Sequence, residues 1–153
     1  MARKPPTADQ LLRLDNQICF AIYSTAHAFN RVYKPLLDRL GLTYPQYLAM
    51  LVIWERDGIP VKEIGERLFL DSGTLTPLLK RLEQAGLVKR TRSTEDERQV
   101  LIALTSSGQA LKDKARAVPS SILAASQCSI PELTAVKNEI VALRDRLNAA
   151  VGV

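Results

Sequence analysis

Residues 70–83 have the sequence Leu-Asp-Ser-Gly-Thr-Leu-Thr-Pro-Leu-Leu-Lys-Arg-Leu-Glu. Asp71 or Ser72 is a favourable N-cap, and apolar residues follow at helical spacing until Gly86. Pro77 removes one backbone hydrogen bond, so we expect the first turns of this helix to bend or tighten. One face of the helix should turn to the core, and its residues are Leu75, Leu78, Leu79 and Leu82.

Two shorter helices are predicted before this segment. Thr43-Tyr44-Pro45-Gln46 is a capping-box pattern that opens a helix through Trp54, which Gly58 can close. Ile59-Pro60 is expected to start a helix over 61–68, with Ile64 and Leu68 turned inward. A short helix, a tight turn and a second helix in this order predict a helix-turn-helix.

The pattern changes after the helix-turn-helix. Residues 87–92 and 99–104 can pair as strands, because apolar residues no longer recur at helical spacing. The connecting loop, Ser93-Thr94-Glu95-Asp96-Glu97-Arg98, is too charged to pack and too short to be a linker. The hairpin is therefore predicted to be the wing of a winged helix-turn-helix module over residues 42–105.

Helices are also predicted at both ends of the chain. Thr7-Ala8-Asp9-Gln10 is a capping box, and the apolar residues beyond it predict one long helix that Pro35 interrupts or kinks before Gly41. Another helix should run from Ser106 to about Val118 and break or bend at Pro119. The last should begin at the capping box Ser129-Ile130-Pro131-Glu132. The apolar positions of the first and last helices are Leu11, Leu14, Ile18, Ile22, Ala26 and Phe29, and Leu133, Val136, Ile140, Leu143 and Leu147.

These terminal helices carry more apolar positions than a winged module can cover. We therefore expect residues 7–41 and 106–153 to form a dimer interface, within a single domain spanning 1–153. The predicted fold class is mainly α with a small β wing.

Composition limits the function further. The 153 residues are 46% apolar and 24% charged, and the net charge of +5 favours a polyanionic partner. No apolar run approaches the length of a membrane span, and no apolar stretch follows Met1-Ala2-Arg3-Lys4, so a cytoplasmic location is expected. We then expect no structural disulfide between the only two cysteines, Cys19 and Cys128, and any disulfide would be regulatory. Two thiols on either side of a DNA-binding module suggest a redox-controlled transcription factor.

The candidate DNA contacts lie on the second helix and the wing. Small hydroxyl side chains let a helix approach base edges, and a helix N-terminus favours phosphate. Arginines on a wing can enter a minor groove, and Asp96 is placed to hold the guanidinium of Arg98. The alternatives are an ordinary capped surface helix and a solvated charged hairpin. The candidate residues are Ser72, Thr74, Thr76, Lys80, Arg81, Arg92, Asp96 and Arg98, with Lys89 and Arg90 adding positive charge.

Two sets of residues resemble known proteins. Asp96-Glu97-Arg98, together with the preceding Leu-Glu-Gln-Ala-Gly-Leu-Val at 82–88, resembles the MarR family of dimeric winged-helix repressors over essentially the whole chain. Residues 14–21, 32–33, 42–47 and 70–78 are similar to organic hydroperoxide resistance regulators (OhrR) within that family. The chain is identified as a member of this type, in its two-cysteine subgroup.

The resemblance implies a set of roles. Cys19 would be the peroxide-sensing thiolate, and Tyr33 and Tyr44 would donate hydrogen bonds to it from the partner subunit. Cys128 would resolve the oxidised thiol, and we expect that disulfide to cross between subunits. The implied protein is a homodimeric repressor that binds double-stranded DNA at an inverted repeat and leaves it when an organic hydroperoxide oxidises Cys19.

Other functions stay open at this point. A MarR-like repressor could be released by a lipophilic or phenolic ligand, with Cys19 merely lining the pocket or buried as a structural residue. A thiol peroxidase is a third hypothesis, although no arginine lies near Cys19 in the sequence and we expect no enzyme. His27 is the only histidine, and with two distant cysteines it predicts neither a metal site nor a cofactor.

Overall fold

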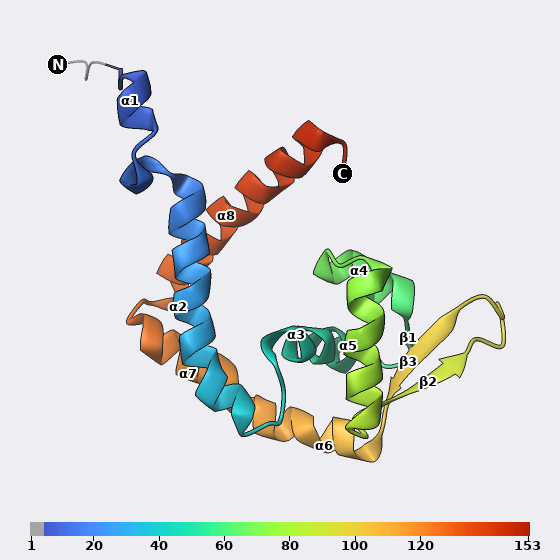
Figure 1. Cartoon of the computed structure of the whole chain (residues 1–153). Coiled ribbons are helices and arrows are strands. Elements are labelled where there is room, and N and C mark those ends of the chain that lie inside the picture. Colours follow the sequence, from blue (N-terminus) through green and yellow to red (C-terminus); the bar gives the residue numbers. More distant parts are fainter. Residues whose placement is uncertain (1–4) are drawn as a thin grey trace. The chain divides into compact units, whose positions relative to one another are not determined.

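The computed structural model describes residues 5–153, and the basic residues Arg3 and Lys4 lie outside this range. It contains helices and one small sheet (Figure 1). The chain divides into two compact units, one ending at Ala115 and the other running from Arg116 to Val153. The elements are α1 (Ala8–Leu11), the 3₁₀ turn η1 (Leu14–Asn16), α2 (Ile18–Asp38), α3 (Tyr44–Glu55), β1 (Ile59–Pro60), α4 (Val61–Leu68), α5 (Ser72–Gln84), β2 (Val88–Arg92), β3 (Val100–Leu104), α6 (Ser106–Ala115), α7 (Ala117–Ser126) and α8 (Ile130–Val151).

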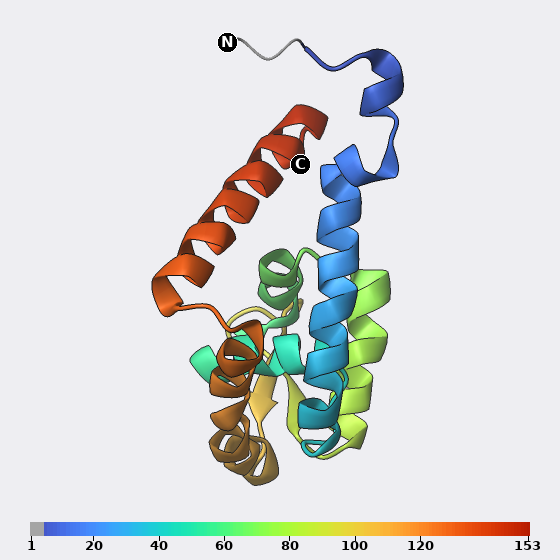
Figure 2. The ribbon, with the colours of Figure 1, turned by 90° about the vertical axis from the view of Figure 1, so that its left-hand side faces the viewer.

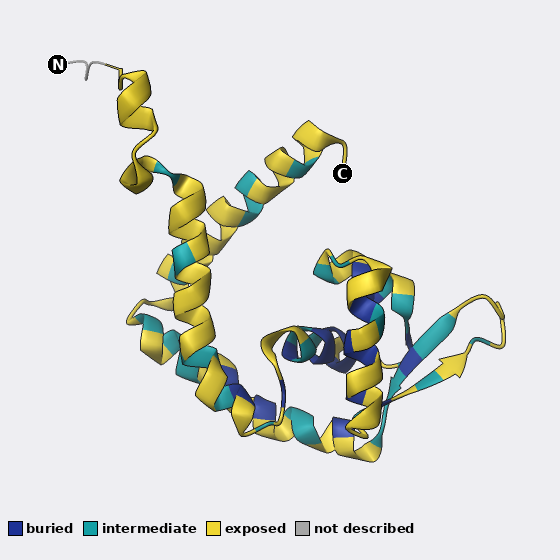
Figure 3. Ribbon diagram, in the orientation of Figure 1, coloured by how far each residue is buried: buried dark blue, intermediate teal, exposed yellow. Residues whose placement is uncertain are grey.

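The first unit contains the predicted winged helix-turn-helix. Helices α3, α4 and α5 contact one another and the sheet, and buried residues gather on these elements (Figure 3). The predicted leucine face of α5 is confirmed, since its four leucines are all buried. Helix α5 continues through Pro77, and the αL residue Gly86 follows its end.

The sheet contains one more strand than the sequence indicates. Its order is β1-β3-β2, and both pairings are antiparallel. Ile59 was expected to start a helix, but it pairs with Ile102 and both side chains are completely buried. Pro60 is tolerated there because β1 is an edge strand, where a missing N–H costs no internal ladder bond. A two-residue strand is too short for periodicity to reveal it.

A close backbone contact fixes α6 to the winged module. Gly108 lies so near the carbonyl of Leu87 that a Cβ atom built on it would be 1.9 Å from that oxygen. The indole of Trp54 donates a hydrogen bond to the Gly108 carbonyl at 2.9 Å. The Thr105 hydroxyl donates to the Gly86 carbonyl at 2.6 Å and accepts from the Gly108 amide at 3.0 Å. Helix α6 is thus attached to α3, to the end of α5 and to the base of the wing.

The predicted long N-terminal helix is wrong in one respect. The Thr7–Gln10 capping box opens only the short α1, and α2 begins at Ile18, after the separate turn η1 (Figure 2). Gln17 has extended backbone, and the side chains of Asn16 and Gln17 donate to the carbonyls of Gln10 and Leu11. Such polar side chains compete with the helical hydrogen bonds and stop the helix. Pro35, by contrast, lies inside α2 without ending it.

The second unit consists of α7 and α8. The predicted break at Pro119 lies instead at Arg116, and Pro119 sits in the first turn of α7, where its missing N–H has no intrahelical partner to lose. The capping box of Ser129 and Glu132 is confirmed at the start of α8. Among residues 5–153 no helix combines the length and the apolar character that a membrane crossing requires.

The contact at Gly108 leads to a first prediction. Gly108→Ala should destabilise the fold by about 3 kcal/mol or more, because the new Cβ can be relieved only by moving the Leu87 backbone away. Chemical denaturation of the two proteins measures the difference. Ser107→Ala, a change at an exposed neighbour, is the matched control and should shift stability by less than about 0.5 kcal/mol. Equal stabilities of the two variants would contradict the close packing.

Candidate nucleic-acid interface and thiol site

The start of α5 is capped by an acidic side chain. The carboxylate of Asp71 accepts a hydrogen bond from the backbone amide of Thr74 at 2.8 Å. Hydrogen bonds from Thr74, first from its backbone and then from its side chain, lower the pKa of Asp71. A negative charge therefore occupies the place where a phosphate was expected to bind. The carboxylate repels a phosphate but can lie near the amino groups on base edges. This end of α5 is therefore better suited to contact bases than phosphates.

The remaining candidate contacts on α5 are mostly accessible. Ser72 and Thr74 are exposed in the first turn, whereas Thr76 is half-buried. Lys80 and Arg81 are exposed further along the helix. Because the leucine face is turned to the core, these polar residues occupy the surface that remains for a partner.

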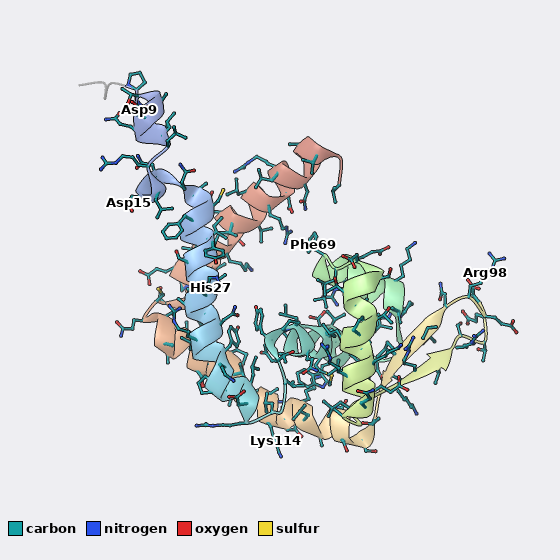
Figure 4. The ribbon with its side chains drawn as sticks, in the orientation of Figure 1. Asp9, Asp15, His27, Phe69, Arg98 and Lys114 are labelled. Atoms are coloured by element: carbon teal, nitrogen blue, oxygen red, sulfur yellow. The ribbon has the colours of Figure 1, made fainter. Side chains whose placement is uncertain are left out.

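The wing carries its charges at its end. Ser93 accepts hydrogen bonds from the amides of Glu95 and Asp96, which closes the turn. Figure 4 shows Arg98 near the tip of the hairpin with its side chain directed away from the strands. Arg92 is exposed at the end of β2.

The role expected for Asp96 changes. Its carboxylate accepts from the backbone amide of Arg98 at 3.0 Å, and in the described chain it forms no ion pair with the Arg98 guanidinium. A carboxylate two residues before an amide favours this local turn over a bond to a long side chain. Asp96 therefore shapes the wing tip and leaves the guanidinium of Arg98 available. The guanidinium of Arg90 forms an ion pair with the carboxylate of Glu83 on α5, at 4.0 Å from Nε to Oε2.

Cys19 lies in the first turn of α2 and is exposed. The amides of a first helical turn have no intrahelical acceptor, so backbone donors are available beside the thiol. The sequence did not indicate this, because a continuous helix from residue 8 would have put Cys19 in its interior. Asp15, which a continuous helix would place one turn before the thiol, belongs to the separate turn η1 (Figure 4).

Three tyrosines from α2 and α3 form one cluster. The ring centroids of Tyr33 and Tyr44 are 4.8 Å apart, and Tyr47 lies 5.9 Å from Tyr33 and 6.4 Å from Tyr44. The structure thus brings together the two predicted tyrosines and adds Tyr47, which the sequence had not singled out. No phenol of the cluster has a hydrogen-bond partner within residues 5–153.

Burial keeps these phenols protonated. It raises the pKa of Tyr33 to about 12, with further contributions from Tyr44 and Tyr47. Burial also raises the pKa of Tyr44 and of Tyr47. Each of the three side chains is therefore a neutral hydrogen-bond donor at physiological pH.

The thiol and the phenols of one chain are far apart. Cys19 and Tyr33 are 14 residues apart on the continuous helix α2, which corresponds to about 21 Å along its axis. One copy of the chain therefore cannot bring its own Cys19 against its own tyrosine cluster without breaking α2.

Cys128 is exposed in the link between α7 and α8. Its thiol lies 3.3 Å from the Ser126 carbonyl, to which it donates, and the next residue, Ser129, caps α8. Cys19 and Cys128 belong to different compact units. His27 packs edge-on against Tyr23, with ring centroids 4.4 Å apart, and no group of three His, Cys, Asp or Glu in the described part could hold a metal ion.

Comparison with known proteins agrees with this geometry. The family model "Transcriptional regulator SarA/Rot" matches residues 31–115. The chain is 52% identical over 139 residues to the HTH-type transcriptional regulator TtmR of Methylorubrum extorquens, covering 91% of this chain and 71% of that protein. It is 50% identical over 137 residues to the organic hydroperoxide resistance transcriptional regulator of Bacillus subtilis, covering 90% and 93%.

Solved structures give the same result. Reduced AbfR bound to DNA superposes with a TM-score of 0.78 at 37% identity, covering 95% of this chain and 99% of that one. AbfR in its disulfide form gives 0.62 at 37% identity, covering 95% and 97%.

The fold and the relatives define a winged-helix transcriptional regulator, not an enzyme. More particularly, the chain belongs to the MarR family and to its organic hydroperoxide resistance (OhrR) type.

The tyrosine cluster leads to a second prediction. Spectrophotometric titration of tyrosinate should show phenols that ionise well above pH 10, and Tyr33→Phe should remove the component near pH 12. The folded state holds the Tyr33 proton more tightly than the unfolded state does, because folding raises the pKa of Tyr33. The protonated phenol therefore contributes fully to stability below pH 10, and this contribution is lost as the pH rises through 12. A titration in which all four tyrosines ionise together near pH 10 would contradict the burial of the cluster.

Proposed function

We propose that the protein is a homodimeric repressor that leaves its operator when an organic hydroperoxide oxidises Cys19. One observation carries this proposal. A thiol at the start of α2 and a cluster of unpartnered phenols about 21 Å further along the helix belong to one chain but cannot meet within it. Two copies related by a twofold axis, with their α2 helices antiparallel, would place each thiol at the other's phenols.

Exposed apolar side chains support a dimer of this kind. Ile18 and Phe20, which flank Cys19, are 61% and 39% exposed in the single chain. Helix α8 exposes a second apolar set, including Val136, Ile140 and Leu147. Monomeric proteins seldom leave so much apolar surface in contact with water. We assign residues 7–41 and 106–153 to dimerisation and 42–105 to DNA binding.

The proposed DNA contacts are the exposed face of α5 and the tip of the wing. Ser72, Thr74 and Thr76 are small enough to approach base edges in the major groove. Lys80, Arg81 and Arg92 supply charge for phosphates, and Arg98 is free to enter the minor groove. In a twofold dimer, two such modules fit an inverted repeat whose half-sites are about 10 bp apart.

The proposed chemistry begins with the Cys19 thiolate. Its sulfur attacks the distal oxygen of the hydroperoxide, the O–O bond breaks, and an S–O bond forms as the alkoxide leaves and takes up a proton to become an alcohol. Tyr33 and Tyr44 of the partner subunit would donate to the sulfur and so favour the thiolate. The Cys128 thiol then attacks the sulfenic acid, which gives an intersubunit disulfide and water.

The response at the DNA would come from movement of the attached helices. A disulfide requires Cα atoms within about 7 Å, so closing it would displace α7 and α8 if the reduced sites are farther apart. Helix α6 leads into α7 and is fixed to α5 and the wing through Gly108, Thr105 and Trp54. A displacement passed through α6 would turn both winged modules and spoil their half-site spacing.

A second candidate is release by a lipophilic or phenolic ligand bound at the aromatic cluster. The three aromatic rings and their free hydroxyls favour such a ligand chemically. In that case Cys19 would only line the pocket.

A third prediction tests the wing. Arg98→Ala should weaken operator binding by about 1–3 kcal/mol, because it removes a groove contact. Titration of a labelled operator at low salt measures the loss. Arg31→Ala removes the same charge from an exposed position on α2, outside the proposed DNA surface. It is the control, compared at a protein concentration at which both variants are dimeric, and it should change affinity much less. If the two variants bind equally well, Arg98 does not contact DNA.

A fourth prediction tests the switch. After one equivalent of cumene hydroperoxide, the wild type should lose DNA binding and run as a covalent dimer on a non-reducing gel, and reductant should reverse both changes. Cys128→Ser should be oxidised at Cys19 without forming the dimer. Cys19→Ser should keep its DNA on oxidation.

The same variants separate the two candidate functions. Release of Cys19→Ser from DNA by a lipophilic phenol alone would favour the non-covalent alternative. If the wild type leaves DNA but remains a monomer band, the intersubunit disulfide is refuted.

A further inference from the structure

The third member of the tyrosine cluster has properties that a packing residue does not need. Tyr47 is only 3% exposed and lies in α3 between the buried residues of the winged module and the two other phenols. Its hydroxyl makes no hydrogen bond, yet no fully buried side-chain oxygen in the described part of the chain lacks a partner. The ring is therefore buried while the hydroxyl oxygen reaches the surface, beside Tyr33 and Tyr44.

At a position that only fills the core, phenylalanine, or a tyrosine whose hydroxyl is hydrogen-bonded, would stabilise the fold more than a tyrosine with an unbonded hydroxyl. An unbonded hydroxyl at the surface of an aromatic cluster is instead an available donor. The cluster thus offers three neutral donors, and burial raises the pKa of each phenol, so none is lost by ionisation at physiological pH.

The three phenols are not equivalent in position. Tyr33 and Tyr44 are the closest pair at 4.8 Å, whereas Tyr47 stands 5.9 and 6.4 Å from them. If Tyr33 and Tyr44 both donate to the sulfur, the hydroxyl of Tyr47 remains available for an atom bonded to that sulfur. During the attack the negative charge passes from sulfur to the alkoxide oxygen that leaves. The oxygen transferred to sulfur becomes a hydroxyl oxygen, which still accepts hydrogen bonds more strongly than sulfur.

We propose that Tyr47 is the third donor of the site and binds the oxygen that the partner subunit's Cys19 acquires from the peroxide. This role rests on the proposed function. Tyr33 and Tyr44 favour the thiolate before the reaction, and Tyr47 stabilises the S–O group as it forms and afterwards. The hydroxyl of Tyr47 then holds the sulfenic acid until the Cys128 thiol attacks its sulfur.

The test uses the full-length dimer in a Cys128→Ser background, so that the sulfenic acid accumulates. Tyr47→Phe should slow oxidation of Cys19 by cumene hydroperoxide by about two- to tenfold, the loss expected for one hydrogen bond. The measurement is made at a pH where the thiol is fully ionised, so a change in thiolate fraction cannot produce it. The sulfenic acid should also proceed faster to irreversible forms, measured by mass spectrometry.

Two further variants separate this role from packing. Met50→Leu alters a completely buried residue of the same helix and should leave the oxidation rate unchanged. A fluorinated tyrosine at position 47 keeps the ring and makes the phenol a stronger donor, so it should speed oxidation or prolong the sulfenic acid. This variant also serves if Tyr47→Phe folds poorly.

The outcomes are distinct. Suppose that the wild type responds to the hydroperoxide and that both position-47 variants are oxidised as fast as the protein with Tyr47. This result would overturn the role of Tyr47 and leave the proposed function intact. A wild type that is not oxidised at Cys19, or that keeps its DNA afterwards, would overturn the proposed function itself.

Discussion

The contact between Gly108 and the carbonyl of Leu87 holds the described winged module to the helix that follows it. At this point the backbones of α6 and of the turn after α5 are closer than any side chain would allow. Trp54 and Thr105 then hold the contact with hydrogen bonds to Gly108 and Gly86. The bond from Trp54 is buried, whereas the bond from Thr105 to Gly86 is exposed. Together these contacts join α5, the base of the wing and α6 within one compact unit. Such a connection is a requirement for any mechanism in which distant helices control DNA contacts.

The second constraint is the interruption before α2. Asn16 and Gln17 bind carbonyls of the preceding turn, so the long helix cannot begin before Ile18. This places Cys19 in a first turn, whose amides have no intrahelical acceptor. The same helix carries Tyr33 far from the thiol. The local break thus sets the position of the cysteine, and the length of α2 makes the site depend on a second subunit in the proposed mechanism.

The candidate DNA surface shows how charge is arranged for recognition. Asp71 closes the start of α5 with a carboxylate, which disfavours phosphate there, while basic residues occupy the later part of the helix and the wing. Asp96 contributes by shaping the wing tip through a backbone hydrogen bond. Acidic side chains near a proposed DNA surface are in this way structural elements that position the basic ones.

Local patterns in the sequence determined most of the secondary structure. The capping boxes at Thr43 and Ser129, the leucine face of α5 and the wing strands depend on neighbours within a few residues, so they were predictable. The family resemblance likewise indicated Cys19, Tyr33 and Tyr44. Tertiary structure alone decided the pairing of Ile59 with Ile102, the contact at Gly108 and the inclusion of Tyr47 in the phenol cluster. Each of these contacts joins residues that lie on different elements, and most are distant in sequence. Hydrophobic periodicity and residue propensity cannot reveal such contacts, because they describe only residues that are neighbours along the chain.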